Sequence, residues 1–311
     1  MEEIYCFAGN PLDRASERRR DSAWVASLLD DPAARVLPLS GLRPLIQDSE
    51  AFELDWQPVA PWREAIEHGA TLVFLGLAEA RPFFAIDAGP AAAEPGSNRE
   101  PLDARSLAPL LPGGEAAILA EARSLIDWHA RHSFCAQCGS PTRVEAAGWV
   151  RRCPECKASH YPRSDPVAIM LAVRGDYGLL GRGRRRPGAR FSCLAGFMEP
   201  GETLEEAVRR EVHEESGIRV GRVKYLACQP WPFPSSLMMG FLCEALSEEI
   251  TVDPEELAEA RWFHREEIRA MVARAASGPD DPTQVSVPGP VAIAHHICRR
   301  WSNGLDTLAT P

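Results

Sequence analysis

The residues best suited to chemistry lie in segment 196–218, which reads GFMEPGETLEEAVRREVHEESGI. Within it, Thr203 followed by Glu206 has the form of a capping box, and Gly217 is typical of a helix end. The spacing therefore predicts a helix over residues 204–216, with both ends fixed and a loop on each side.

The carboxylates of this predicted helix fall partly on its apolar side. At about 100° per residue, Glu211 and Glu215 share a side with Val208 and Val212, and Glu214 lies at its margin. Carboxylates that point toward a core repel one another in a low dielectric unless a cation lies among them. Crowded oxygen ligands suit Mg²⁺ or Mn²⁺, which also bind substrate phosphates. The alternative, an ordinary surface helix, predicts the carboxylates opposite the apolar stripe.

A second chemical pattern consists of two CxxC pairs separated by 14 residues. The four residues are Cys135, Cys138, Cys153 and Cys156. Two such knuckles joined by a hairpin make the tetrahedral sulfur cage that zinc prefers, and Gly139 supplies open backbone after the first pair. We expect one structural zinc ion per chain. The alternatives are a redox-active dithiol, which is usually a single CxxC after a strand, and a ribbon that reads nucleic acid.

Composition limits the class of protein. The chain has 311 residues, 45% of them hydrophobic and 25% charged, which excludes wholesale disorder. A net charge of -10 argues against a protein that coats DNA. The acidic start is unlike a secretory signal, the apolar run 167–173 is too short to span a bilayer, and nine cysteines suit a reducing compartment. We therefore expect a cytoplasmic protein that does not enter a membrane.

Three regions differ in character along the chain. We predict an N-terminal α/β domain of unclear role over residues 1–130, a zinc ribbon over residues 131–163, and a catalytic domain over residues 164–311. Strands are predicted over 71–77, 82–86, 166–173, 177–180, 223–227, 237–243 and 261–263. Helices are predicted over 115–129, 204–216 and 291–301. Interleaved strands and helices favour an α+β or α/β sandwich.

Segment 196–218 also resembles the Nudix box, a pattern of fixed residues that defines a hydrolase family. The matching residues are Gly196, Glu202, Arg210, Glu211, Val212, Glu214, Glu215, Gly217 and Ile218. The resemblance implies an α/β/α sandwich with a mixed sheet and the metal-dependent hydrolysis of a nucleoside diphosphate linked to another group. It further implies that Glu211 and Glu215 are the principal metal ligands, that Glu214 is a further ligand, and that Arg210 orients the carboxylates.

Segment 229–236, QPWPFPSS, indicates what the substrate is. Its prolines make a stiff, extended chain that presents the rings of Trp231 and Phe233 to a planar base; the alternative is an edge loop with buried aromatics. The segment resembles the signature of the NADH pyrophosphatase (NAD⁺ diphosphatase) subfamily, with Cys228 in place of an initial serine. That resemblance implies eight substrate-binding residues: Gln229, Pro230, Trp231, Pro232, Phe233, Pro234, Ser235 and Ser236.

The subfamily resemblance covers residues 134–301. It implies that Tyr161 borders the nucleotide, that Glu256 is a metal ligand or base, that Ala195 offers its carbonyl to a metal, and that Ala294 lines the site. The implied enzyme is a homodimer that splits NADH or NAD⁺ into nicotinamide mononucleotide and AMP, and that also removes NAD caps from RNA. The rivals are a Nudix hydrolase of ADP-ribose or another dinucleotide, and a zinc-ribbon protein that binds nucleic acid.

A basic run, RGRRRPGAR, occupies residues 182–190. Such a run is usually a solvated hairpin tip. The alternative is that it attracts a phosphate chain, including the RNA of an NAD-capped transcript.

Overall fold

The computed structural model describes residues 5–46, 52–89, 101–184, 188–278 and 283–308, so the centre of the basic run, residues 185–187, lies outside the described residues. The chain forms two compact units: the first contains Met1–Ser164 and Pro230–Ser235, and the second contains Asp165–Gln229 and Ser236–Pro311. Within the described ranges, no helix has the length and apolar character needed to cross a bilayer.

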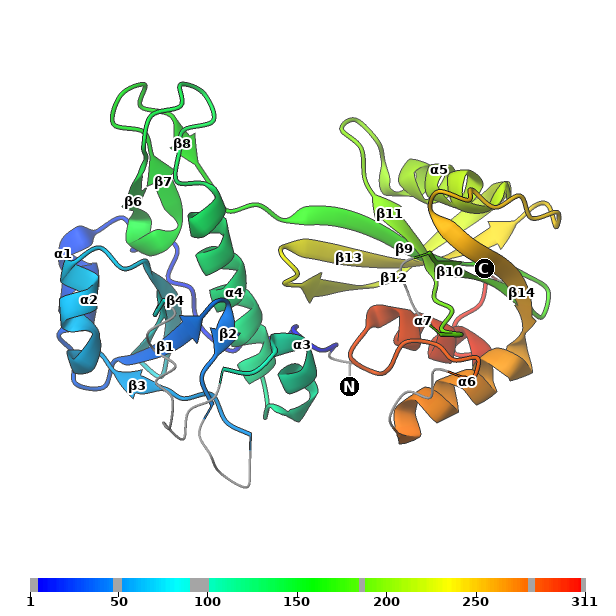
Figure 1. The fold of residues 1–311 in the computed structure, drawn as a ribbon, viewed down its shortest axis with the longest axis horizontal. Helices are drawn as coiled ribbons and strands as arrows, with labels where there is room; N and C mark the ends of the chain where they lie inside the picture. The colour runs from blue at the N-terminus through cyan, green and yellow to red at the C-terminus, as the bar shows by residue number, and fades with distance from the viewer. Residues whose placement is uncertain (1–4, 47–51, 90–100, 185–187, 279–282, 309–311) are drawn as a thin grey trace. The chain divides into compact units, whose positions relative to one another are not determined.

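The second unit is built on a mixed sheet with the strand order β12-β13-β9-β10-β14, with β11 also paired to β9 (Figure 1). Its strands are β9 (Asp165–Arg174), β10 (Tyr177–Gly183), β11 (Leu194–Phe197), β12 (Val220–Trp231), β13 (Ser236–Ala245) and β14 (Leu257–His264). Its helices are α5 (Leu204–Ser216), α6 (Arg265–Ser277) and α7 (Ile293–Ser302). Strand β13 runs parallel to β9, whereas β10 and β11 run antiparallel to it.

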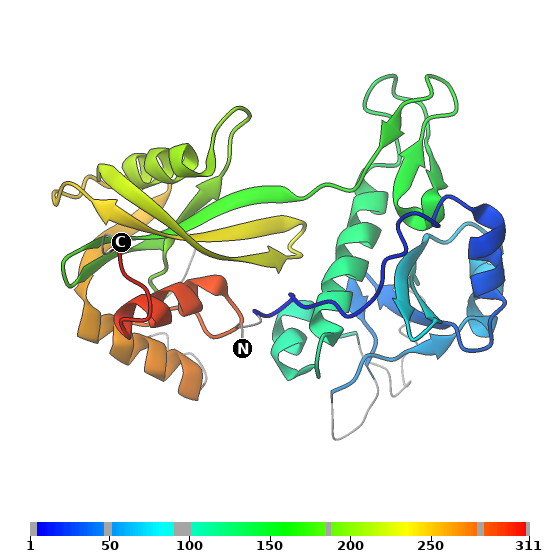
Figure 2. The same ribbon diagram turned by 180° about the vertical axis from the view of Figure 1, so that it is seen from behind.

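Strand β9 explains why helices cover both faces of this sheet. Successive side chains of a strand point to opposite faces, and here both sets are apolar. Ile169 and Leu171 pack in one core with α6 and α7, whereas Ala168 and Met170 pack in another with α5. The two views show α5 on one side of the sheet and α6 with α7 on the other (Figures 1 and 2). The expected α/β/α sandwich with a mixed sheet is confirmed.

The first unit has its own sheet, ordered β2-β1-β5-β4, with β3 paired to β1. Its strands are β1 (Arg35–Ser40), β2 (Arg43–Pro44), β3 (Gln57–Pro58), β4 (Leu72–Ala78) and β5 (Arg81–Asp87). Its helices are α1 (Ser22–Leu29), α2 (Arg63–Glu67), α3 (Ala104–Leu107) and α4 (Glu115–Arg131), with the short 3₁₀ turns η1 (Ala60–Trp62) and η3 (Ala108–Leu110). Val73 and Leu75 face α4, and Phe74 packs on the side of α1 and α2.

A small ribbon completes the first unit. It consists of β6 (Arg143–Glu145), β7 (Val150–Arg152) and β8 (Ser159–His160), with the 3₁₀ turn η4 (Ala146–Gly148) between the first two strands. Loops project from the end of this ribbon in both views (Figure 2). These loops carry the four cysteines.

Candidate active site

Helix α5 has the ends that its sequence predicts. It spans Leu204–Ser216, and both hydrogen bonds of the Thr203–Glu206 capping box are formed. Gly217 ends the helix in the left-handed conformation, with φ of 71°. Because both ends are fixed by local contacts, every side chain between them has a defined direction.

Glu211 and Glu215 lie on the buried side of α5. They are only 8% and 7% exposed and neighbour the fully buried Val208 and Val212. Glu214 differs, since its side chain is 52% exposed. The surface-helix alternative is therefore wrong for two of the three carboxylates.

Arg210 joins the carboxylates of the candidate site. Its Nε and Nη2 donate to the two carboxylate oxygens of Glu202 at 2.6 and 2.9 Å, and its Nη1 donates to Glu211 at 2.7 Å and Glu214 at 3.0 Å. Nη2 also donates to the Phe197 carbonyl at 2.9 Å. These bonds from Arg210 lower the pKa of Glu202 to about 2. Sequence reasoning gave Glu202 no role of its own; the structure shows that it fixes the guanidinium.

Gly196 makes room for the Glu211 carboxylate. A Cβ at position 196 would lie 1.9 Å from both Cδ and Oε2 of Glu211, and 2.1 Å from Oε1. Gly196 is in β11, so the carboxylate lies directly against the strand backbone. A glycine is required here because of this close approach rather than for a special backbone angle.

Glu215 is an acid in an environment that disfavours its charge. Burial, followed by the negative charges of Glu211 and Glu256, raises the pKa of Glu215 to about 8, while a hydrogen bond with the Ala195 backbone opposes the shift. Its Oε2 is buried and has no hydrogen-bond partner among the residues that the structure describes. A buried carboxylate oxygen without a donor, next to two further carboxylates, fits a site for a divalent cation.

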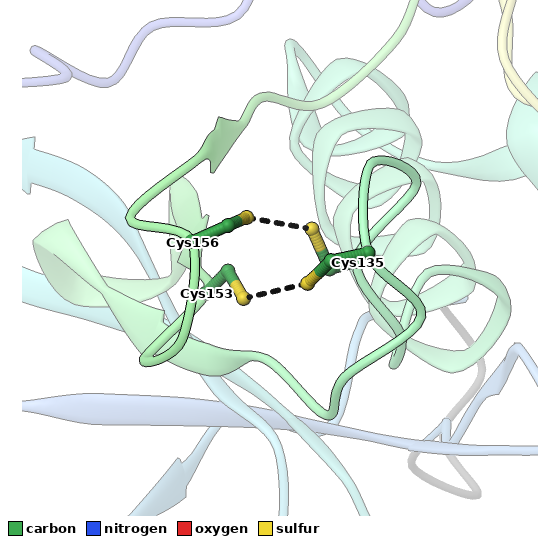
Figure 3. Close-up of side chains that lie close together, drawn as sticks. Cys135, Cys153 and Cys156 are labelled. Carbon is green, nitrogen blue, oxygen red and sulfur yellow. Dashed lines mark hydrogen bonds between the residues drawn. The ribbon is translucent and has the colours of Figure 1, made fainter.

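The four cysteine sulfurs converge at the end of the ribbon (Figure 3). All four lie within 4.8 Å of one another, and the pairs Cys135–Cys156 and Cys138–Cys153 are each 3.5 Å apart. Tetrahedral zinc with Zn–S bonds of about 2.3 Å would hold its sulfurs about 3.8 Å apart. Among the described residues, this is the only group of three or more His, Cys, Asp or Glu side chains whose ligand atoms lie close enough together to share a metal ion. The carboxylate oxygens of the second unit do not lie as close to one another.

The knuckle geometry agrees with the zinc interpretation. Gly139 has φ of 78° after the first CxxC, and Lys157 has φ of 62° at the equivalent place after the second. Hydrogen bonds from Ser140 lower the pKa of the exposed Cys138 thiol, which favours the thiolate that binds metal, whereas for Cys156 a hydrogen bond from Ala158 is outweighed by burial and the other three sulfurs, which raise its pKa.

Gln229, which was predicted to bind substrate, makes its side-chain hydrogen bonds to the backbone of the second unit. Its side chain is fully buried; Nε2 donates to the Val291 carbonyl and Oε1 accepts from the Ile293 amide, both at 2.8 Å. These bonds fix the start of α7. Ala294, on the first turn of that helix, is 2% exposed and belongs to the apolar core.

Residues 230–235 belong to the first unit, where the rings of Trp231 and Phe233 are half-buried. The Phe7 ring packs edge-on against both rings, at 5.8 Å between centroids in each case. The Arg105 guanidinium lies 5.0 Å from the Trp231 ring centre and 4.7 Å from that of Phe233. These partners come from distant sequence positions.

Arg123 holds the backbone of the same segment. Its Nε donates to the Pro232 carbonyl at 2.7 Å, its Nη1 donates to the Leu42 carbonyl at 2.5 Å, and its guanidinium lies 4.8 Å from the Phe233 ring centre. The Ser124 hydroxyl donates to the Pro234 carbonyl at 3.4 Å. We call Phe7, Arg105 and Arg123 the tip clamp. Nothing in the spacing of these three residues pointed to this role.

The remaining predicted residues lie in different settings. Tyr161 is 60% exposed and lines a pocket of the first unit. Glu256 is exposed at the start of β14, close enough to raise the pKa of Glu211 and Glu215 by its charge. Ala195 is in β11, beside Gly196.

Known families match nearly the whole chain. Residues 163–284 match the NUDIX domain, residues 130–161 the NADH pyrophosphatase zinc ribbon domain, and residues 33–128 the NADH pyrophosphatase-like rudimentary NUDIX domain. The chain is 38% identical to the NAD-capped RNA hydrolase NUDT12 of Homo sapiens over 95% of this chain and 72% of that protein. It is 37% identical to the NAD-capped RNA hydrolase NudC of Stutzerimonas stutzeri, over 81% and 90% respectively.

A solved NUDIX hydrolase from Nitrosomonas europaea is 24% identical, with a TM-score of 0.44 over 55% of this chain and 90% of that one. From the sequence matches, the chain belongs to the Nudix hydrolase family. Its ribbon and N-terminal matches assign it, within that family, to the NADH pyrophosphatase group. The resemblance drawn from the sequence is thereby confirmed, and the four cysteines are those of the group's zinc ribbon.

Proposed function

We propose that this chain is a metal-dependent hydrolase that splits NADH or NAD⁺ into nicotinamide mononucleotide and AMP, and that removes NAD caps from RNA. The observation that carries the proposal is the burial of Glu211 and Glu215 on α5. Gly196 leaves room for the Glu211 carboxylate, and Arg210 donates a hydrogen bond to it. The relatives named as NAD-capped RNA hydrolases, 37–38% identical, support the choice of substrate.

The proposed catalytic cation is Mg²⁺ or Mn²⁺. Glu211, Glu215 and Glu256 and the carbonyl of Ala195 are the proposed ligands, with Glu214 as a further one. When bound, such an ion neutralises the charge on diphosphate oxygens and lowers the pKa of a coordinated water. The unpartnered Oε2 of Glu215 supports this assignment.

The chain's own residues orient the groups and move a proton. Arg210 holds the Glu211 carboxylate in one direction by a bond of 2.7 Å. In the overall reaction, water adds to one phosphorus, the bridging P–O bond breaks, and each mononucleotide keeps one phosphate. The alternative role proposed for Glu256 is that of the base: it is exposed and close to the other glutamates, so a Glu256 carboxylate that does not bind the ion would accept the proton that the water loses.

The proposed substrate-binding residues are 229–236, with Tyr161 and Ala294; of these, the buried Gln229 and Ala294 are proposed to support the site from behind and not to touch the substrate. Within that segment, Trp231 and Phe233 offer faces to a planar ring, and Gln229 acts by holding α7. The zinc ion of the ribbon is proposed to be structural, one per chain, because four sulfur ligands leave no open position. A homodimer, a cytoplasmic location and domain limits at residues 130 and 163 stay predictions.

The proposal is tested by product analysis. Steady-state turnover of NADH, NAD⁺, ADP-ribose and an NAD-capped oligonucleotide is compared with Mg²⁺ and with Mn²⁺. NADH or NAD⁺ should be preferred to ADP-ribose and give AMP together with the nicotinamide mononucleotide. A preference for ADP-ribose over both nicotinamide forms would remove the assignment.

A matched pair of variants tests the site itself. Glu215→Gln should abolish turnover while zinc content and fold remain. Glu205→Gln, which changes an exposed carboxylate at the start of the same helix, should leave turnover unchanged. Equal activity of the two variants would contradict the proposed catalytic role of Glu215.

A further inference from the structure

A pocket of about 680 Å³ lies within the first unit, between the segment that leads into α1 and the zinc ribbon. Arg19, Arg20 and the α1 residues Val25 and Leu29 form one side, and Arg152 with Tyr161 belongs to the other. We call it the α1–ribbon pocket. Its volume lies in the range of small-molecule sites, and neither the proposed cation ligands nor the zinc cysteines line it.

The pocket is basic in a chain that is acidic overall. Three arginines line it against one acidic residue, Glu145, although the whole chain carries a net charge of -10. No acidic side chain in the described part of the chain pairs with Arg20, which is exposed. A local excess of positive charge on an acidic protein attracts a polyanion to that place.

One of the arginines is held in place by its surroundings. The Arg19 guanidinium lies 3.9 Å from the centre of the Trp149 ring, and Trp149 Nε1 donates to the Phe74 carbonyl at 2.8 Å. Arg19 Nη1 is buried and has no hydrogen-bond partner within the described ranges. On the ribbon side, Arg152 donates to the Ser159 hydroxyl at 2.5 Å. The cations are therefore partly ordered before any ligand arrives, which reduces the entropy lost on binding.

The pocket also has an apolar surface. Helix α1 buries none of its residues fully, so Val25 and Leu29 remain partly open on the pocket side. Val144 of the ribbon, 43% exposed, adds to this surface, and the Tyr161 ring is 60% exposed. Arginines beside apolar and aromatic surface match a nucleotide, whose base stacks or packs while its phosphate pairs with a guanidinium.

We propose that the α1–ribbon pocket binds the RNA body of an NAD-capped transcript, as single-stranded nucleotides downstream of the cap. This inference rests on the proposed removal of NAD caps, in which Tyr161 borders the nucleotide. Tyr161 lines this pocket together with the three arginines, so a nucleotide bordered by Tyr161 lies beside positive charge within the first unit. NADH lacks the downstream nucleotides, so it would reach no further into the pocket than Tyr161 and would not contact the arginines.

The test compares two substrates in the full-length, zinc-containing protein. Arg20→Glu should raise KM for a capped single-stranded oligonucleotide roughly tenfold and leave KM for NADH unchanged. Arg20→Ala should make the dependence of log(kcat/KM) on log salt shallower by about 0.7, the share of one phosphate contact on a single strand. Ala26→Arg, which adds a cation to the same wall, should lower KM for the capped oligonucleotide.

The control is Arg43→Glu, a charge reversal at an exposed position of β2 outside the pocket. Equal effects of the Arg20 and Arg43 reversals would overturn the proposal, since general repulsion would then explain both. A parallel rise in KM for NADH would also overturn it. Competition for the pocket by an acidic peptide, but not by an uncapped oligonucleotide, would overturn the proposal as well.

The outcome separates this inference from the proposed function. If NADH is hydrolysed normally and the Arg20 variants treat capped RNA as wild type does, only the pocket proposal fails. If the wild-type protein hydrolyses neither substrate, the proposed function fails. Fluorescence anisotropy of the labelled oligonucleotide with the same variants then still decides whether the pocket binds RNA.

Discussion

Replacement of Gly196 by alanine tests whether the position of the Glu211 carboxylate limits the reaction. The new methyl carbon would lie 1.9 Å from the Glu211 carboxylate, far inside any contact distance. The strand backbone of β11 is paired to β9, so the flexible end of the glutamate side chain has to give way. The substitution therefore displaces the carboxylate and leaves its charge intact.

The size of the effect follows from that distance. An ordinary carbon contact begins near 3.4 Å, so the carboxylate must retreat by roughly 1.5 Å, and misplacement on this scale costs on the order of 100-fold in rate. The retreat also strains the bond of 2.7 Å from Arg210 to Glu211. Stability should change little, because alanine is easier to order in a strand than glycine.

The assay is steady-state hydrolysis of NADH over a range of Mg²⁺ concentrations, together with thermal unfolding. Gly196→Ala should lose about 100-fold in kcat or need far more Mg²⁺ while the melting temperature stays near that of wild type. Gly183→Ala is the matched control, because it adds a methyl group to β10 with no described atom within 4 Å. Wild-type kcat and Mg²⁺ dependence in Gly196→Ala would refute the reasoning.

Three further predictions concern the first unit. Arg123→Lys keeps the positive charge but loses the guanidinium group that donates to the Pro232 carbonyl, so KM for NADH should rise about tenfold at unchanged kcat. An equal fall in kcat would argue against a role for Arg123 that is limited to positioning segment 230–235. Removal of zinc by a chelator should expose the loops around Cys135 and Cys153 to protease; unchanged cleavage would contradict a structural ion. Burial raises the pKa of Glu121 from 4.5 to about 7. Between pH 4.5 and 7 the folded form holds a proton that the unfolded chain has lost, so the free energy of unfolding should fall by up to about 3 kcal/mol over this range. Glu121→Gln should flatten this pH dependence in urea titrations. The same pH dependence in the variant and the wild type would disprove the prediction.

The features that sequence predicted best are those set by local contacts. Helix α5 has the predicted bounds because its capping box and terminal glycine each act over a few residues. The burial of Glu211 and Glu215 followed from helical periodicity alone. The zinc knuckles could be predicted equally well, since the CxxC spacing and Gly139 determine the turn through local contacts alone.

The features that sequence missed depend on residues far apart. The tip clamp joins Phe7, Arg105 and Arg123 to residues more than 100 positions away, and none of the three belongs to a motif. Helix α6 (Arg265–Ser277) was not predicted, although its first turn carries the capping contacts of His264. Gln229 matched a substrate-binding motif, but periodicity gave no sign that its amide would bond to the start of α7.

The two inward-facing carboxylates of α5 have different partners. Inward carboxylates were expected to require a cation, and for Glu211 the chain itself supplies one in Arg210, which also bonds Glu202 and Glu214. For Glu215 the described part of the chain supplies none: one oxygen stays buried without a donor there, and the pKa of Glu215 rises to about 8. The two buried glutamates therefore differ, because one is oriented by a guanidinium and the other has a buried oxygen to which the proposed ion would bind. This difference is why Glu215→Gln should cost more activity than the loss of any single bond that Arg210 makes.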